Sequence, residues 1–142
     1  FSSKDFISSF LEDHTNLLFK YVRIQPGRPV IFSKLKSNFY FSLPGNPLAV
    51  FINLFLLISL FIDPSRNNNS SITKYYRSAF SENKKSNITK FYRVKLSKNL
   101  LHTHNSKGSA KLISLAEADG LAIVPEGINK IKKGEKINFI EF

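Results

Sequence analysis

The feature that most constrains the fold is the almost wholly apolar stretch Leu48–Ile62, LAVFINLFLLISLFI. As a helix, these fifteen residues would rise about 22 Å, less than the roughly 30 Å hydrocarbon core of a bilayer. The stretch also holds Asn53 and Ser59, and the PGNP sequence directly before it prevents extension upstream. A helix that is apolar nearly all round is typical of a helix buried on the face of a covered sheet. We therefore predict a globular α/β core and no membrane span.

The segments before this helix predict another helix and two strands. A capping-box-like start at residues 2–5 opens a helix that ends near His14, with its apolar residues on one face. Leu17–Ile24 is rich in β-branched and aromatic residues and predicts a strand, and Asn38–Leu43 predicts another. The expected order is helix, strand, loop, strand, loop, helix, so the stretch between the two strands is predicted as a loop.

A polar segment at residues 63–71, DPSRNNNSS, interrupts every hydrophobic period. Such a segment predicts a domain boundary, and we expect an α/β domain in residues 1–66 and a separate module in residues 67–142. The chain opens at Phe1 and contains no methionine, so we expect it to be the C-terminal portion of a longer protein.

The second module is predicted to be small and β-rich, with one helix. Its first two strands, at residues 72–80 and 88–96, are expected to be joined by a polar, solvated turn that contains Lys84. The helix at residues 109–118 is expected to end with Gly120 as a left-handed cap. Further short strands are predicted at residues 121–124 and 136–142.

The composition excludes several kinds of chemistry. The chain has no cysteine, so disulfides, thiolate zinc sites, iron–sulfur clusters and cysteine nucleophiles cannot form. His102-Thr103-His104 would place two imidazoles on one strand face, but the polar surroundings favour a solvated loop over a metal site. Functional groups must therefore be oxygen, nitrogen and backbone groups.

The net charge of +11 is concentrated in residues 67–107, which carry nine basic side chains and one acidic side chain. Such a segment suits the phosphates of a nucleic acid or an anionic small molecule. No nucleic-acid-binding motif accompanies it, and 16 of the 21 basic residues are lysines, in a composition typical of AT-rich coding bias. Nucleic acid is therefore not the expected partner. A basic module that stacks RNA bases on Tyr75, Tyr76 and Tyr92 is the weakest alternative.

Two Pro-Gly loops carry the strongest local signals. In Pro44-Gly45-Asn46-Pro47, Asn46 can cap the next helix and Pro47 suits its first position, which leaves backbone N–H groups for an anion. In Pro26-Gly27-Arg28-Pro29, the prolines fix the backbone and Arg28 offers a planar fork to an oxyanion. A capped helix without a ligand and an ordinary tight turn remain the alternatives. If the preceding strands are parallel, both loops lie at one sheet edge, where α/β folds bind ligands.

Five motifs occur in order between about Asp5 and Phe142: PGRP, FSLPGNPLAV, FYRVKL, GSAKLISLAEADGLAIVPEG and KKGEKINF. This order resembles the C-terminal region of the molybdopterin molybdenumtransferase family, which includes MoeA and the gephyrin E domain. The resemblance implies the later half of a three-layer α/β pterin-binding domain, followed by a small β-barrel-like domain. It also implies insertion of molybdate into adenylylated molybdopterin with release of AMP, assisted by Mg²⁺, in a cytoplasmic homodimer without a membrane partner.

The resemblance further implies roles for single residues. Asp5 is similar to an active-site aspartate that handles the metal or the pterin phosphate, and is the catalytic and Mg²⁺ candidate. A dianionic oxyanion suits Arg, hydroxyl and N–H donors, which agrees with the residue types at the other positions. The positions that match motifs near molybdate or the pterin are Arg28, Pro29, Pro44, Gly45, Asn46, Pro47, Arg93 and Ser109.

Two positions depart from the family's motifs. Gln25 stands where the family has a lysine, and Ala49 stands where it usually has a serine. Each loss should weaken oxyanion binding by about 1–3 kcal/mol at a desolvated site. The chain is therefore predicted to be the C-terminal part of a molybdenum insertase, inactive without its upstream domains. The alternative is a non-catalytic remnant or scaffold module that keeps the fold.

Overall fold

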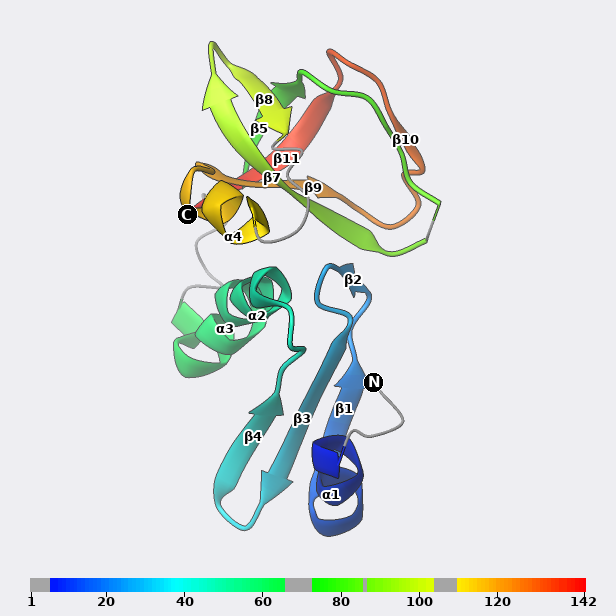
Figure 1. Ribbon diagram of the computed structural model, residues 1–142, viewed down its shortest axis with the longest axis vertical. Coiled ribbons are helices and arrows are strands. Elements are labelled where there is room, and N and C mark those ends of the chain that lie inside the picture. Colours follow the sequence, from blue (N-terminus) through cyan, green and yellow to red (C-terminus); the bar gives the residue numbers. More distant parts are fainter. Residues whose placement is uncertain (1–5, 66–72, 86, 104–109) are drawn as a thin grey trace. The chain divides into compact units, whose positions relative to one another are not determined.

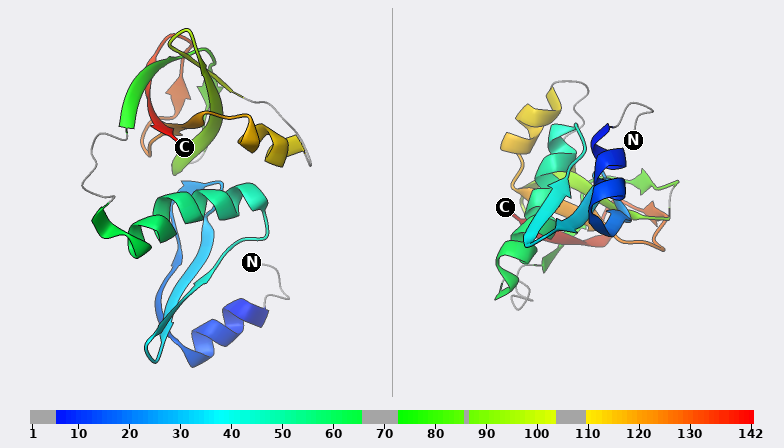
Figure 2. Two further views of the ribbon diagram at one scale, coloured as in Figure 1. Left: turned by 90° about the vertical axis from the view of Figure 1, so that its left-hand side faces the viewer. Right: turned by 90° about the horizontal axis from the view of Figure 1, so that it is seen from below.

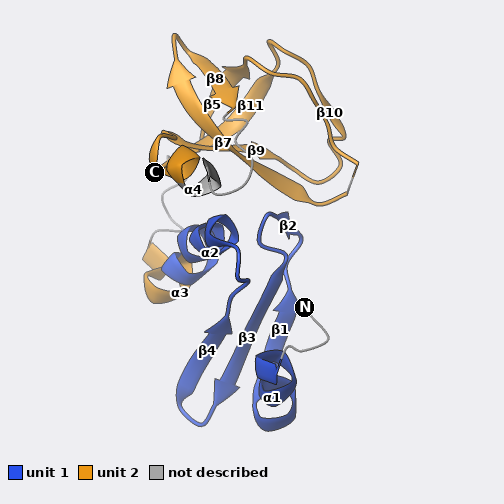
Figure 3. Ribbon diagram, viewed as in Figure 1, with its two compact units in different colours: residues 1–59 blue, residues 60–142 orange. Residues whose placement is uncertain are grey.

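The computed structural model describes residues 6–65, 73–85, 87–103 and 110–142 (Figure 1). The chain forms two compact units, residues 1–59 and residues 60–142 (Figure 3). Most of the boundary expected at residues 63–71 lies outside the described residues, so the division at residue 66 stays a prediction.

The first unit contains a three-stranded antiparallel sheet in the order β1-β3-β4. Its central strand is the most buried, and Val30 and Ile31 are closed off from solvent. A two-residue strand, β2 (Ile24–Gln25), lies in the connection before the central strand. The sheet strands are β1 (Asn16–Tyr21), β3 (Pro29–Leu35) and β4 (Asn38–Ser42).

Strand β3 corrects the expectation of a loop between two strands. Pro29 occupies its first position, where a missing N–H is tolerated in a sheet. Ser33 is as buried as Ile31, so the strand shows no simple alternation of apolar and polar residues. The proline-rich entry and the buried serine together hid a central strand, whereas the two expected strands are confirmed as β1 and β4.

The apolar stretch is helical, as predicted, but contains a π-helical turn. It consists of α2 (Pro47–Asn53), the π-helical segment Leu54–Ile58 and α3 (Ser59–Ile62). The buried residues all lie in α2, whereas Leu60 and Ile62 are exposed. Burial on all sides is therefore wrong for the later part of the stretch. Within the ranges described, no helix is long and apolar enough to cross a membrane.

The predicted N-terminal helix is confirmed as α1 (Phe6–His14). Leu11 is buried, but the other apolar residues of the expected face, Phe6, Ile7 and Phe10, are each more than half exposed. The apolar face of α1 is therefore only partly used for packing within the first unit.

The second unit contains a closed five-stranded β-barrel, which bears out the predicted barrel-like module (Figure 2). The strand order round the barrel is β7, β8, β5, β11, β9 and back to β7. Strands β5 and β8 are parallel, and the other neighbours are antiparallel. Helix α4 (Ala110–Ala116) and a ribbon of β6 (Glu82–Asn83) and β10 (Lys130–Ile131) also belong to this unit. The barrel strands are β5 (Thr73–Ser78), β7 (Thr89–Ser97), β8 (Leu100–Thr103), β9 (Gly120–Val124) and β11 (Lys136–Glu141).

Apolar side chains from all five strands fill the barrel. Val94 of β7, Leu101 of β8 and Phe139 of β11 are fully buried, and Tyr76 of β5 packs against Phe139 with the ring centroids 5.5 Å apart. A core of this kind follows from strand alternation, because every second residue of a barrel strand points inward.

Strand β8 was missed by the sequence analysis and corrects two expectations. It lies between β5 and β7, so these two strands are not the joined pair that was predicted. His102 and Thr103 belong to β8 instead of a solvated loop, with His102 exposed, while His104 lies outside the described residues. The strand is only four residues long, too short for a clear periodic signal.

Lys84 is buried and not part of a solvated turn. Its side chain is only 5% exposed, and its ammonium group donates hydrogen bonds to the carbonyl oxygens of Ile88 (2.8 Å) and Pro125 (2.5 Å). Desolvation by burial lowers the pKa of Lys84. The lysine therefore ties the start of β7 to the end of β9 from inside the protein.

Gly120 also has a different role from the one predicted. It is the first residue of β9 and does not adopt the left-handed conformation of a helix cap. A Cβ atom at this position would lie 2.2 Å from the carbonyl oxygen of Ile140. Glycine is required here because β9 and β11 approach each other closely.

Candidate functional site

The two Pro-Gly loops lie at one edge of the β1-β3-β4 sheet. Ile31, near the start of β3, pairs with Ser42, the last residue of β4. The chain therefore enters β3 and leaves β4 at the same edge. The two loops therefore lie at the same edge of the sheet, as expected. The reason differs from the expected one, because β3 and β4 are antiparallel and not parallel.

The first loop holds its arginine near an aromatic ring. Gly27 is buried and has a φ of +115°, and the Gln25–Pro26 peptide bond is cis. The backbone N–H of Val22 donates to the carbonyl oxygen of Arg28 at 3.0 Å. The guanidinium carbon of the exposed Arg28 lies 5.6 Å from the ring centroid of Tyr21, within cation–π range.

Asn53 connects this loop to the helix that follows the second loop. It is fully buried, and its Nδ2 donates to the carbonyl oxygens of Gly27 (3.1 Å) and Ala49 (2.9 Å). Its Oδ1 is buried and has no hydrogen-bond partner among the described residues. This role of Asn53 was not predicted from the sequence, although a single asparagine in an otherwise apolar helix was the available signal.

The second loop ends in the predicted helix cap. The side-chain oxygen of Asn46 accepts a hydrogen bond from the N–H of Leu48 at 3.0 Å, and Pro47 occupies the first helical turn. This confirms the capping role of Asn46. The space beside Gly45 is open, since no heavy atom lies within 4 Å of a Cβ atom built there.

Arg93 lies on β7 in the second unit. Its Nη1 donates to the hydroxyl of Ser114 on α4, and burial lowers the pKa of the guanidinium group. Helix α4 thus holds the arginine in place. Ser109 and Asp5 lie outside the described residues.

The described residues do not fit a Mg²⁺ site. In the part of the chain that the structure describes, no group of three or more His, Asp or Glu side chains is placed to hold a metal ion. Asp5, the proposed ligand, is not among these residues. The metal thus finds no support in the geometry of the described residues.

The two loops offer a cation and no carboxylates. Neither residues 22–29 nor residues 43–50 contain Asp or Glu, whereas Arg28 supplies a cation. At the start of α2, Pro47 has no N–H, and the N–H groups of Leu48 and Val50 already donate to Asn46. A cation in loops without carboxylates suits a tetrahedral oxyanion.

Comparison with known proteins identifies relatives of the chain. The family described as the MoeA C-terminal region (domain IV) matches residues 75–142. The molybdenum cofactor synthesis protein cinnamon of Drosophila melanogaster is 42% identical over 57 residues, covering 37% of this chain and 9% of its own length. A molybdopterin molybdenumtransferase of Haemophilus influenzae is 33% identical over 54 residues, which cover 38% of this chain and 13% of that protein.

Solved structures extend the likeness to nearly the whole chain. A molybdopterin biosynthesis MoeA protein from Pyrococcus horikosii is 28% identical with a TM-score of 0.79, over 96% of this chain and 34% of that one. A molybdenum cofactor biosynthesis protein from Pyrococcus furiosus, at 22% identity and a TM-score of 0.76, shares the fold over 99% of this chain and 55% of that one. The chain thus spans about a tenth of the curated relatives and about a third of the first solved one. Residues 75–142 belong to the C-terminal region (domain IV) of the MoeA family.

Proposed function

We propose that this chain is the C-terminal part of a molybdopterin molybdenumtransferase, which inserts molybdate into adenylylated molybdopterin with release of AMP. In this proposal, residues 1–66 are the later half of a three-layer pterin-binding domain, and the whole enzyme is a cytoplasmic homodimer. Because the chain spans only part of its relatives, turnover is assigned to the whole protein and not to these residues alone.

The observation that carries the proposal is the shared sheet edge of the two Pro-Gly loops. The Ile31–Ser42 pairing brings the loops together, and the hydrogen bond from Asn53 to Gly27 holds the Arg28 loop against α2. An arginine whose loop is held in place by such a buried hydrogen bond is suited to bind an oxyanion. The roles of Asp5, Arg93 and Ser109 rest on the family resemblance.

The test is equilibrium binding of molybdate to the 142-residue chain, compared with sulfate at equal ionic strength. We expect Arg28→Ala to weaken molybdate binding about tenfold or more, because a charge-assisted hydrogen bond is worth about 1.5–3 kcal/mol. The matched control is Lys36→Asn, which removes a cation in the β3–β4 turn at the opposite sheet edge. Lys36 has a φ of 54°, a conformation that asparagine tolerates.

Two results would contradict the proposal. Equal losses for Arg28→Ala and Lys36→Asn would mean that only diffuse positive charge attracts the anion. Equal affinities for molybdate and sulfate would mean that the loops bind any tetrahedral dianion.

A second candidate function is a scaffold or remnant that keeps the fold without turnover. Two observations favour it: Gln25 is exposed at the position of a family lysine, and Ala49 is only 3% exposed at the position of a family serine. If the unaltered chain binds no molybdate although it is folded, this candidate is preferred.

A further inference from the structure

Four side chains of β5 and β11 form a group on one face of the barrel wall. Tyr75 pairs with Asn138, and Arg77 pairs with Lys136, in neighbouring positions of the antiparallel register. Directly opposed residues point to the same face, as do residues two apart on one strand. We call these four residues the β5–β11 cluster. Tyr75 is 66% exposed, and both cations are exposed as well.

The cluster contains two like charges directly opposite each other. Such a pair destabilises a sheet. Arg77 is held by a hydrogen bond from its Nη1 to the carbonyl oxygen of Gly134, at 2.9 Å. In the described ranges, Lys136 has no ion-pair partner, and the adjacent Glu135 carboxylate accepts the backbone N–H of Lys132 at 2.9 Å. An anion bound between Arg77 and Lys136 would relieve their repulsion.

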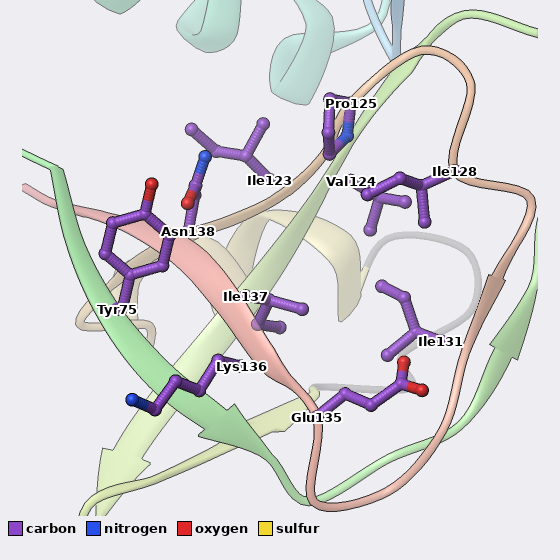
Figure 4. Close-up of a pocket in the computed structure, with 10 residues that line it drawn as sticks. All are labelled: Tyr75, Ile123, Val124, Pro125, Ile128, Ile131, Glu135, Lys136, Ile137 and Asn138. Atoms are coloured by element: carbon purple, nitrogen blue, oxygen red, sulfur yellow. The ribbon is translucent and has the colours of Figure 1, made fainter.

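A pocket with a volume of about 170 Å³ opens beside the cluster (Figure 4). Tyr75, Lys136 and Asn138 line it from the cluster side, and its remaining lining is mostly aliphatic. Figure 4 shows Ile137 in the middle of the pocket wall and Ile131 on the side away from Tyr75. A cavity of about 150 Å³ is large enough for benzene, so one aromatic ring matches this space.

We propose that the pocket and the β5–β11 cluster bind a small molecule consisting of one aromatic ring and one phosphate or carboxylate group. The ring occupies the aliphatic part of the pocket beside Tyr75, and the anionic group lies between Arg77 and Lys136. Adenylylated molybdopterin is too large for this space, because sites for ligands of drug size are about 300–1,000 Å³. The proposal is therefore independent of the molybdate site.

The experiment follows backbone amide chemical shifts of the isotope-labelled 142-residue chain during titration with phenyl phosphate. Inorganic phosphate and phenol are titrated separately at the same ionic strength. We expect saturable chemical-shift changes at Tyr75, Lys136 and Asn138. The affinity for phenyl phosphate should be at least about fivefold higher than that for inorganic phosphate or for phenol. Binding as tight with inorganic phosphate or with phenol would overturn the proposal, as would the absence of saturation.

Matched variants test whether the anion binds to a specific lysine or only to the overall positive charge. Lys136→Gln should weaken phenyl phosphate binding about three- to fivefold, as expected for one exposed ion pair. Lys95→Gln, which removes an exposed strand lysine of β7 outside the pocket, should leave binding unchanged. Tyr75→Phe should retain binding and Tyr75→Ser should weaken it, since the ring and not the hydroxyl makes the contact. Equal losses for Lys136→Gln and Lys95→Gln would refute the site.

Discussion

The side-chain amide of Asn53 donates a hydrogen bond to the backbone carbonyl of Gly27, 26 residues earlier in the chain, at a distance of 3.1 Å. Asn53 is fully buried, so this bond crosses the interior of the first unit. It fixes the backbone directly before Arg28 to the helix that Asn46 caps. The two loops of the proposed oxyanion site thus depend on one buried asparagine that belongs to neither.

Replacing this asparagine should destabilise the first unit. Asn53→Ala removes the donor to both Gly27 and Ala49, and we expect a loss of about 1–3 kcal/mol in the free energy of unfolding. Ser59→Ala is the control, because it removes a local hydrogen bond to Phe55 in a half-buried position. Urea denaturation measures both changes. If the two variants lose the same stability, the bond from Asn53 to Gly27 has no special importance.

Gly27 should be intolerant of any side chain. Its φ of +115° is unfavourable for alanine, and a Cβ atom would lie 2.8 Å from the Nδ2 of Asn53. We expect Gly27→Ala to cost about 1–3 kcal/mol in thermal or urea unfolding. Gly45→Ala, in the other loop, should change stability by less than about 0.5 kcal/mol, because the space beside it is open. A loss of stability for Gly45→Ala as large as that for Gly27→Ala would contradict the conclusion that the space beside Gly45 is open.

Lys84 should stabilise the second unit although it is a buried cation. Lys84→Met keeps the length of the side chain but leaves the carbonyls of Ile88 and Pro125 without their donor. We expect a loss of about 2 kcal/mol in the free energy of unfolding. Lys85→Met, at the exposed neighbouring position, should be nearly neutral. Comparable losses would show that Lys84 is solvated, as the sequence first indicated.

The pKa of Lys84 gives this prediction a pH dependence. Burial lowers the pKa in the folded state below its ordinary value of 10.5, so near that pH the unfolded chain binds more protons than the folded one. Titration of Lys84 therefore makes stability rise as the pH approaches 10.5 from below. The difference in unfolding free energy between the unaltered chain and Lys84→Met should grow as the pH rises toward 10.5. A constant difference would mean that the folded-state pKa of Lys84 is not lowered.

The sequence predicted elements whose signal is local. Asn46 and Pro47 specify a helix start by themselves, and the barrel-like second module followed from the order of motifs in the family. Strand β3 and strand β8 were missed because neither has a clear local signal: β3 buries Ser33 as completely as Ile31, and β8 is too short to show a period.

Functional side chains were predicted less completely than the elements that carry them. Arg28 and Asn46 stand next to prolines and glycines, which mark them in the sequence. Asn53 and Lys84 act through backbone carbonyls that are distant in the chain, and no local pattern records such contacts. A polar residue in an apolar run, or a lysine in a polar turn, has the same sequence signal whether it is buried or solvated.

The departure at Gln25 gives the last prediction. Gln25 is exposed in the loop that presents Arg28, at the position where the resemblance implies a lysine. Gln25→Lys should therefore restore a cation beside the proposed oxyanion site and tighten molybdate binding about threefold or more. Asn16→Lys adds the same charge at the exposed start of β1, which pairs with Lys34 at the opposite edge of the sheet, and should have little effect. Equilibrium binding of molybdate at fixed ionic strength compares the two variants. Equal gains in molybdate affinity would show that net charge alone attracts the anion. No gain in affinity for Gln25→Lys would mean that the loop does not bind an oxyanion.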